Sequence, residues 1–405
     1  MEAADIIREH LNDDVYALSA KDKWFDNWNK RWLLQQIQSR QKAQSKLPSW
    51  YGNFDLLFPS PLSVEQASSE LTADYKSQMA EKSAPDHRSL LDLTGGMGVD
   101  AAAFATRFQQ VIYVENQNEV AETAKHNFHQ LKLKNVEVNC ADAAAFLAEN
   151  CDKKYDCIFM DPARRKNGQK VFRLEDCEPN VLELWPLLTQ QTPMLILKLS
   201  PMLDIHQLMR TLPLVAEIHV VAVHNEVKEL LCSFHTQNIE NDVGNPQIFC
   251  VNLENNGVKK AQFSYGERNA VVGLTDNVGR FLYEPHPTLM KAEMMNVAAN
   301  KLNLQKLHPH SHLYTSDELH SDFFGRIFEV ESVFGMGKSE LKAGISGLDK
   351  ALITVRNFPL TEAELRKRLK LADGGDITLI ATTLTKNKHV IIKAKRVINV
   401  IKKHT

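Results

Sequence analysis

Four acidic residues stand at or just after the ends of short apolar runs in the middle of the chain: Asp92, Glu115, Asp142 and Asp161. Ligands of open α/β sheets bind in the crevice at the carboxyl ends of the strands, so we expect these four side chains to border one crevice. Carboxylates accept hydrogen bonds from hydroxyl and amino groups. The row therefore predicts a site for a molecule that contains a nucleoside.

A glycine-rich turn follows Asp92 and leads into a helical stretch that begins near Ala101. Three glycines without side chains let a nucleoside approach the backbone closely. The residues of this turn that we expect to bind a cofactor are Asp92, Thr94, Gly95, Gly96, Gly98 and Asp100. In the alternative interpretation the glycines only form a tight strand-to-helix turn, and Asp100 caps the helix.

The charge of the turn bears on which cofactor it binds. The spacing Gly96-x-Gly98-x-x-Ala101 also fits the dinucleotide fingerprint. A dinucleotide places its pyrophosphate at the positive end of the following helix, where the carboxylate of Asp100 would repel it. S-adenosylmethionine (SAM) has no phosphate, and its ammonium and sulfonium groups are cations. Asp92 and Asp100 therefore favour SAM over NAD, and an NAD-dependent dehydrogenase is kept as an alternative.

Glu115 and Asp142 are expected to bind the nucleoside part of the cofactor. Glu115 can accept hydrogen bonds from both ribose hydroxyls, a feature that NAD enzymes share. Asp142, which Ala143 follows, can accept a hydrogen bond from the adenine amino group. Asp142 also fits the N-cap of the helix that runs to Glu149, and the two roles can coexist.

The pair Asp161-Pro162 directly follows the fourth apolar run and is the candidate catalytic pair. A carboxylate and the carbonyl beside a rigid proline can orient a substrate N–H and accept the proton that it sheds. Arg164 and Arg165 can bind a substrate phosphate bidentately, or they are surface charges. Lys198 is a further substrate-binding candidate, with a strand-end surface lysine as the alternative.

The apolar runs between Ser89 and Leu253 alternate with helical stretches, which is the pattern of a parallel sheet with crossover helices. We therefore expect a doubly wound, Rossmann-like α/β domain. The residues before it lack strand patterns and are expected to be helical, with one helix starting at Ser63 behind a capping box. Trp24, Trp28 and Trp32 have the spacing of one helix face, which packs on a core or stacks on bases.

The region after about residue 254 mixes strand and helix patterns without a glycine fingerprint, which predicts small α+β modules. We expect a helix over 288–302, strands over 353–358 and 378–383, and a helix over 361–371 between those strands. From Leu341 to Thr405 there are 14 Lys or Arg and 5 Asp or Glu, a local balance of +9. This basic segment could bind a polyanion.

The composition is that of a globular protein, with 43% hydrophobic and 24% charged residues and no apolar stretch of the ~20 residues that a membrane span needs. The start Met-Glu-Ala-Ala-Asp differs from a signal peptide, so we expect a cytoplasmic protein. The 6 cysteines contain no Cys-x-x-Cys pair and are expected to be small buried residues. His308, His310 and His312 lack acidic or thiolate neighbours, so no metal site is expected.

Asp92 to Asp100, Glu115, Asp142 and Asp161-Pro162, in this order and spacing, resemble the class I SAM-dependent methyltransferases over about residues 89–234. The sequence Asp-Pro-Ala-Arg-Arg is similar to the Asp-Pro-Pro-Tyr motif of amino-methyltransferases and the Asp-Pro-Pro-Arg motif of some RNA methyltransferases. It departs from both motifs, and no aromatic residue follows the proline. A stacking partner for a flipped base would then come from Phe172, Phe234 or the N-terminal tryptophans.

The flanking segments resemble a bacterial group of methyltransferases with a THUMP-like domain. The segments that carry this resemblance are 62–76, Tyr283 to Ala292, His308 to Ser316 and Thr354 to Leu360. The resemblance implies a methyltransferase domain over 86–255, a ferredoxin-like module over 278–322 and a THUMP-like module over 323–402. The helical region that the sequence pattern predicts before them covers 1–85. The resemblance also implies that Gln66 lies over the methionine end of SAM, and that the partner is RNA, either tRNA or rRNA.

The sequence thus predicts a SAM-dependent methyltransferase that acts on a base nitrogen of RNA. Methylation at carbon 5 of a pyrimidine needs a cysteine nucleophile, and none follows the runs that end at Met160 and Leu197. Two alternatives stay open beside the dehydrogenase. One is an RNA-binding scaffold with a degenerate methyltransferase domain, and the other is a methyltransferase that acts on a substrate other than RNA.

Overall fold

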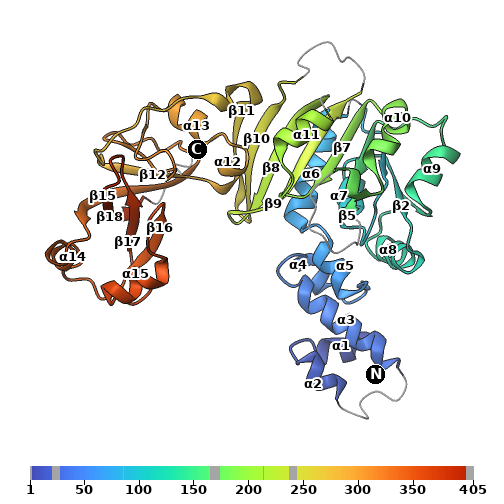
Figure 1. The fold of residues 1–405 in the computed structure, drawn as a ribbon. Coiled ribbons are helices and arrows are strands. Elements are labelled where there is room, and N and C mark those ends of the chain that lie inside the picture. Colours follow the sequence, from blue (N-terminus) through green and yellow to red (C-terminus); the bar gives the residue numbers. More distant parts are fainter. Residues whose placement is uncertain are drawn as a thin grey trace, which may run out of the picture. The chain divides into compact units, whose positions relative to one another are not determined.

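The computed structural model describes residues 2–20, 28–84, 86–164, 174–212, 214–236 and 244–397 (Figure 1). They fall into two units. The first comprises Met1–His224, Lys228–Pro246 and Leu253–Val258, and the second comprises Asn225–Val227, Gln247–Asn252 and Lys259–Thr405. Arg165 and Phe172, both named above as candidates, lie outside the described residues.

The first unit begins with short helices, as the sequence predicts. They are α1 (Ala3–Glu9), α2 (Val15–Ser19), α3 (Lys30–Ala43), α4 (Pro48–Gly52), α5 (Pro61–Gln66) and α6 (Glu70–Ser83). The prediction that Trp24, Trp28 and Trp32 share one helix face is wrong for Trp28. Asn29 caps α3 by accepting a hydrogen bond from the Trp32 backbone N–H, so Trp28 precedes the helix, and its ring stacks on Trp32 at 6.0 Å between centroids. Trp24 lies outside the described residues.

The single helix expected from Ser63 is also wrong, because the chain leaves the helical conformation at Ala67. Ser60 caps α5, and Ser69 caps α6 in a capping box with Thr72. The two serines accept hydrogen bonds from backbone N–H groups that no helical carbonyl can satisfy. The interruption places Ser68 between the two helices, where its side chain contacts the glycine turn.

A mixed sheet forms the body of the first unit and confirms the expected doubly wound α/β fold. Seven of its nine strands are β1 (Ser89–Asp92), β2 (Gln110–Glu115), β3 (Val136–Cys140), β4 (Cys157–Met160), β7 (Met194–Leu199), β8 (Val215–Val223) and β9 (Glu226–His235), in the spatial order β8-β9-β7-β4-β1-β2-β3. The other two, β10 (Gln247–Glu254) and β11 (Gly257–Ser264), continue the order beyond β8. The five strands from β7 to β3 are parallel, and β9 pairs antiparallel with β7. The chain order reverses between β1 and β4, which is the switch point at which such sheets bind ligands.

Helices make the crossovers between the strands. They are α7 (Val99–Ala105), α8 (Asn118–Gln130), α9 (Ala143–Glu149), α10 (Val181–Gln191) and α11 (Ile205–Thr211). A short ribbon of β5 (Ala163–Arg164) and β6 (Cys177–Glu178), with a 3-10 turn at Leu174–Asp176, follows β4. The residues of β1, β2, β4 and β7 are almost all buried, as expected for strands that helices cover on both faces, whereas the edge strand β3 has no buried residue.

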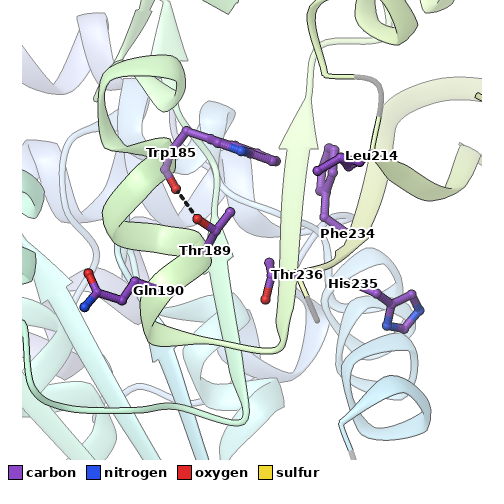
Figure 2. Close-up of a pocket in the computed structure, with 7 residues that line it drawn as sticks. All are labelled: Trp185, Thr189, Gln190, Leu214, Phe234, His235 and Thr236. Atoms are coloured by element: carbon purple, nitrogen blue, oxygen red, sulfur yellow. Dashed lines mark hydrogen bonds between the residues drawn. The ribbon is translucent and has the colours of Figure 1, made fainter. Parts of the chain in front are cut away.

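A pocket of about 260 Å³ lies at the end of the sheet that is opposite to the carboxyl ends of the parallel strands (Figure 2). The residues that line it include Trp185, Phe234 and His235. The rings of Trp185 and Phe234 meet edge to face, with their centroids 5.1 Å apart. Phe234 is fully buried and pairs with Leu195 near the start of β7. The suggestion that Phe234 stacks on a substrate base is therefore wrong.

The second unit contains one sheet with the strand order β13-β14-β12-β15-β18-β17-β16. Its strands are β12 (Phe281–Pro285), β13 (Gln305–Lys306), β14 (Tyr314–Ser316), β15 (Gly325–Gly335), β16 (Leu352–Arg356), β17 (Ile377–Thr383) and β18 (His389–Arg396). Its helices are α12 (Pro287–Lys291), α13 (Met295–Lys301), α14 (Lys338–Gly344) and α15 (Glu362–Leu369). The boundary between the units passes through β10 (Gln247–Glu254) and β11 (Gly257–Ser264), and a 3-10 turn follows at Tyr265–Asn269.

The α+β character expected for this region is confirmed, including the strand–helix–strand order of β16, α15 and β17. The single helix expected over 288–302 is wrong, because Glu293 has φ +59° and separates α12 from α13. The cysteine prediction holds in part: Cys157, Cys232 and Cys250 are buried, whereas Cys140 and Cys151 are exposed. None of the described helices is both long and apolar enough to cross a membrane.

Candidate active site

Five candidate residues lie along the carboxyl edge of the parallel strands. Their order across the sheet follows the strand order: Lys198 on β7, Asp161 after β4, Asp92 at the end of β1, Glu115 at the end of β2 and Asp142 after β3. The sequence-based expectation that the four acids border one edge agrees with this topology. Asp161 and Asp92 flank the switch point between β4 and β1.

The glycine turn after β1 requires glycine at two positions for steric reasons. A Cβ at Gly95 would lie 2.1 Å from the Tyr113 ring, and the Tyr113 hydroxyl donates a hydrogen bond to the Gly96 carbonyl at 2.6 Å. Gly98 has φ +87°, and a Cβ there would lie 2.7 Å from Phe128. At Gly96 (φ +50°) a Cβ would meet only a backbone oxygen at 3.9 Å, so space is open in front of this residue.

Asp92 is the least satisfied acid of the site. Its side chain is fully buried, its Oδ1 accepts a hydrogen bond from the Thr94 N–H at 3.1 Å, and its Oδ2 has no partner among the described residues. Burial raises the pKa of Asp92 well above its usual value, and the neighbouring Asp100 raises it further. A cationic group at this position would compensate the buried charge.

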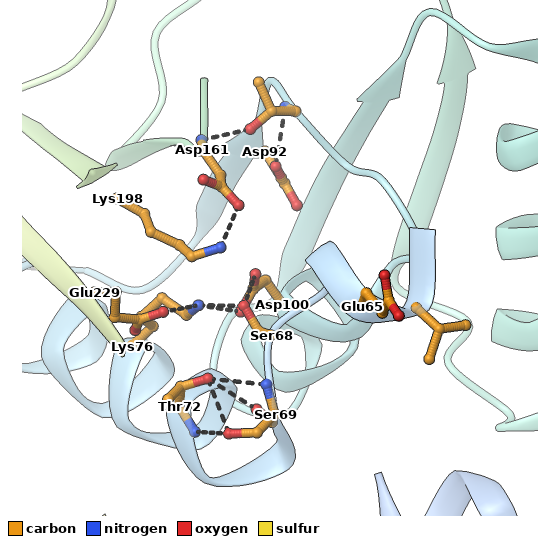
Figure 3. Close-up of polar contacts among 12 residues, drawn as sticks. Glu65, Ser68, Ser69, Thr72, Lys76, Asp92, Asp100, Asp161, Lys198 and Glu229 are labelled. Carbon is orange, nitrogen blue, oxygen red and sulfur yellow. Dashed lines mark hydrogen bonds and ion pairs between the residues drawn. The ribbon is translucent and has the colours of Figure 1, made fainter. Parts of the chain in front are cut away.

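Asp100 lies in the first turn of α7 and belongs to a buried polar cluster (Figure 3). The Lys76 ammonium lies 2.8 Å from its Oδ1, and the Ser68 hydroxyl donates to its Oδ2 at 2.7 Å. Burial raises the pKa of Asp100, but Lys76 and Lys198 lower it by more, so the net shift is downward. Lys76 is itself fully buried and also lies 3.6 Å from Glu229 of β9.

This pairing modifies the charge argument made from the sequence. From the sequence, Asp100 is expected to be a free carboxylate at the start of a helix. In the structure Lys76 neutralises Asp100, and the uncompensated acid of the turn is Asp92. The preference for a cationic ligand over a pyrophosphate therefore depends on Asp92 more than on Asp100.

Asp161 forms an ion pair with Lys198 across the two neighbouring strands (Figure 3). The Asp161 backbone N–H also donates to the Thr94 hydroxyl at 2.6 Å, which joins the end of β4 to the glycine turn. Burial lowers the pKa of Lys198, but Asp161, Glu229 and Asp100 raise it by more, so the ammonium stays charged. Pro162 is buried, whereas about a third of the Asp161 side chain (34%) remains exposed.

The carboxylates of Glu115 and Asp142 both accept hydrogen bonds from nearby backbone N–H groups. Glu115 accepts hydrogen bonds at 2.9 Å from the N–H groups of Gly96 and Gln117, one on each carboxylate oxygen. Each oxygen keeps a lone pair that a ribose hydroxyl can use. Asp142 caps α9 by accepting hydrogen bonds from Ala144 and Ala145, and Ala143 is buried beside it. The expected N-cap role of Asp142 is thus confirmed, while its role toward adenine stays a prediction.

Some predicted residues are not placed in this cluster. Gln66 is an exposed residue at the end of α5, and it is Ser68 that contacts Asp100 of the turn. Arg164 begins the short ribbon after Pro162, and its side chain lies outside the described residues. Within the described part of the chain, no group of three His, Cys, Asp or Glu side chains could bind a metal.

Sequence reasoning missed three members of the cluster: Ser68, Lys76 and Glu229. A signal existed for two of them, because Lys76 shares a helix face with Ala73, Met79 and Ala80 at i−3, i+3 and i+4, and Glu229 directly precedes the apolar run Leu230–Phe234. Charged residues at such positions are almost never fully buried unless they are paired. The sequence did not show which charges would pair.

Three family models match parts of the chain. A model described as Conserved hypothetical protein 95 matches residues 77–181, a ferredoxin-like domain model matches residues 281–323, and a THUMP domain-like model matches residues 325–396. The latter two confirm the ferredoxin-like and THUMP-like character expected for the C-terminal modules.

Two relatives match nearly the whole chain. A crystal structure from Porphyromonas gingivalis W83, assigned as a methyltransferase, shares 33% sequence identity with a TM-score of 0.85, and the match covers 98% of each chain. An uncharacterised SAM-dependent methyltransferase of Mycobacterium tuberculosis (strain CDC 1551 / Oshkosh) is 22% identical over 366 residues, which cover 87% of this chain and 92% of that protein. These matches agree with the arrangement of the site.

Proposed function

Because this chain belongs to the SAM-dependent methyltransferases in which a ferredoxin-like and a THUMP-like domain follow the methyltransferase domain, we propose that it methylates a nitrogen atom of an RNA base. The observation that carries the proposal is the Asp161–Lys198 pair at the switch point, beside the unsatisfied Asp92. We further propose that the enzyme acts in the cytoplasm, where its RNA substrate would be made.

The residues of the crevice fit SAM. The partnerless oxygen of Asp92 suits a cation, the open space at Gly96 suits a flat or extended ligand, and Glu115 has lone pairs for ribose hydroxyls. We assign these residues, with Thr94, Gly95, Gly98, Asp142 and Ala143, to cofactor binding. When bound, SAM supplies an activated methyl group on sulfur.

Asp161 and Pro162 are assigned to the substrate. The exposed part of the Asp161 carboxylate and the carbonyl beside Pro162 can accept hydrogen bonds from an exocyclic amino group, which fixes the nitrogen for in-line attack. Lys198 holds Asp161 in place, and because its pKa is raised it acts as a cation rather than as a base. The proton of the amino group then leaves to Asp161 or to water.

RNA is proposed over other acceptors because of the C-terminal modules. The model that matches residues 325–396 is described as THUMP domain-like, and the segment from Leu341 carries the local charge balance of +9. Arg164 and Arg165 are retained as candidates for contacts to the substrate phosphates.

The test compares modified nucleosides in tRNA and rRNA from a deletion strain and from the strain complemented with wild type or Asp161→Ala. We expect one methylated nucleoside to disappear on deletion and to return only with wild type. Asp152→Ala, which removes an exposed acid outside the crevice, is the control and should complement fully. Unchanged nucleosides in the deletion strain, together with methyl transfer by the purified enzyme to protein or small molecules, would assign a different substrate.

A further inference from the structure

Glu284 of the second unit lies between two arginines that come from different strands. Its side chain is only 8% exposed, and its Oε2 lies 2.5 Å from Arg326 Nη2. Its Oε1 lies 2.6 Å from Arg356 Nη2 and accepts a hydrogen bond from Arg356 Nε at 2.8 Å. Glu284 belongs to β12, Arg326 to β15 and Arg356 to β16, so the two ion pairs join residues far apart in sequence.

The neighbouring side chains belong to sequence segments that the methyltransferase domain does not use. The Asn357 amide lies 3.0 Å from His308 Nδ1, and the rings of His308 and His310 are 5.5 Å apart. Asn357 adopts φ +50°, and its carbonyl accepts a hydrogen bond from the Thr383 hydroxyl. The segments around residues 284, 308 and 356 thus meet at one place, and the loop after β16 is fixed there.

The charges at this place are unequal. One carboxylate faces two guanidinium groups, which leaves a net charge of +1, whereas the exposed pair of Arg280 and Glu329 on the same sheet is balanced. The side chains of Arg326 and Arg356 are 47% and 37% exposed. Both therefore combine a fixed orientation with access from solvent.

The remaining N–H donors of the two arginines can bind a second anion. Besides Glu284, the described residues give Arg356 one further bond, from Nη1 to the Val355 carbonyl at 2.8 Å, and they give Arg326 none. A guanidinium has five N–H donors in a planar fork that matches phosphate oxygens. Because Glu284 holds both guanidinium groups in place, their remaining N–H donors are already oriented before a phosphate group binds.

We propose that Arg326 and Arg356 bind a phosphate of the RNA backbone, with Glu284 as the positioning residue that orients both guanidinium groups. The choice of RNA as the ligand rests on the proposed function. These three residues belong to the second unit and the candidate active site is built from residues of the first, so the test measures binding and does not require methyl transfer.

The experiment measures the affinity of the full-length protein for a fluorescently labelled, unmodified tRNA transcript at several salt concentrations. Arg326→Ala and Arg356→Ala should each weaken binding about tenfold, as expected for loss of a charge-assisted contact. Each should also reduce the slope of log K against log salt by about one. Arg280→Ala is the matched control, because it removes an exposed arginine of the same unit and should leave the affinity and the slope unchanged.

Two further variants separate binding from folding and from catalysis. Arg326→Lys keeps the charge but loses the fork, so its affinity should lie between those of wild type and Arg326→Ala while its melting temperature stays close to that of wild type. Asp152→Ala, at an exposed acid of the first unit outside the crevice, should bind the transcript like wild type, and all binding is measured without SAM so that methyl transfer plays no part. Folded Arg326→Ala and Arg356→Ala proteins with wild-type affinity and salt slope would overturn the proposal. Equal effects on a DNA duplex of the same length would overturn the choice of RNA.

Discussion

Because Asp92 is buried without a counter-charge, replacing it should raise the stability of the ligand-free protein and lower its affinity for SAM. Asp92→Asn keeps the shape of the side chain and removes a charge whose Oδ2 has no partner. An unsatisfied buried polar group costs about 1–3 kcal/mol, and more when it is charged. In the absence of ligand, Asp92→Asn should therefore unfold at a higher temperature than wild type. The same change should weaken SAM binding by about 1.5–3 kcal/mol, or about 10- to 160-fold.

Asp100→Asn is the matched control, because Asp100 follows in the same turn and only 12% of its side chain is exposed. It is paired with Lys76, whose side chain is fully buried. Removing one partner of a buried ion pair costs about 3–5 kcal/mol. Glu229, 3.6 Å from Lys76, compensates part of the remaining charge, so we expect the lower end of this range. Asp100→Asn should therefore lower the melting temperature.

The two acids should also respond to pH in opposite directions. The pKa of Asp92 is raised in the folded state, so its contribution to stability is present below the unfolded pKa and is lost as the pH rises through the folded pKa. The pKa of Asp100 is lowered, so its contribution is present above the unfolded pKa and is lost as the pH falls through the folded pKa. In each variant the corresponding pH dependence should disappear.

The first assay is thermal unfolding without ligand, from a pH below the folded pKa of Asp100 to a pH above the folded pKa of Asp92. The second is isothermal titration calorimetry with SAM. If Asp92→Asn lowers the melting temperature as much as Asp100→Asn does, the argument from uncompensated burial is refuted. An unchanged SAM affinity in Asp92→Asn would refute its assignment to the cofactor. Because the chain has two units, the unfolding transition of the first unit must be resolved from that of the second.

Three other predictions concern the crevice. Asp161→Ala should abolish methyl transfer and leave the SAM affinity measured by calorimetry unchanged; a large loss of affinity would mean that Asp161 contacts the cofactor. Gly96→Val should abolish both, because a β-branched residue is strained at φ +50° and fills the open space, and wild-type SAM affinity in this variant would place the cofactor elsewhere. Gly95→Ala should lower the melting temperature because of the 2.1 Å approach to Tyr113, which Tyr113→Ala in the same chain should relieve in part.

The sequence was sufficient to predict residues whose position follows from strand topology. Asp92, Asp161 and Lys198 end strands that are adjacent in a parallel sheet, so once the strands are recognised their side chains fall on one edge. The contact between Lys198 and Asp161, which lie 37 positions apart in sequence, is of this kind.

Residues whose position depends on local helix breaks could not be predicted in this way. Ser68 reaches Asp100 because the chain leaves the helix at Ala67, and neither glycine nor proline marks that break. Glu293 interrupts the helix expected over 288–302 in the left-handed conformation, which is uncommon for a glutamate. The pairing of Glu284 with two arginines depends on the arrangement of the strands in the second sheet, for which the sequence gives no periodic signal.

The contacts of Asp100 have a consequence for how this protein can be divided or recombined. Lys76 and Ser68 belong to the chain that precedes β1, while the acid that they stabilise belongs to the turn that follows β1. A fragment cut just before β1 would keep every strand of the sheet and lose the counter-charge of a buried carboxylate. Grafts between relatives should therefore transfer α6 together with the turn from Asp92 to Asp100 as one inseparable segment.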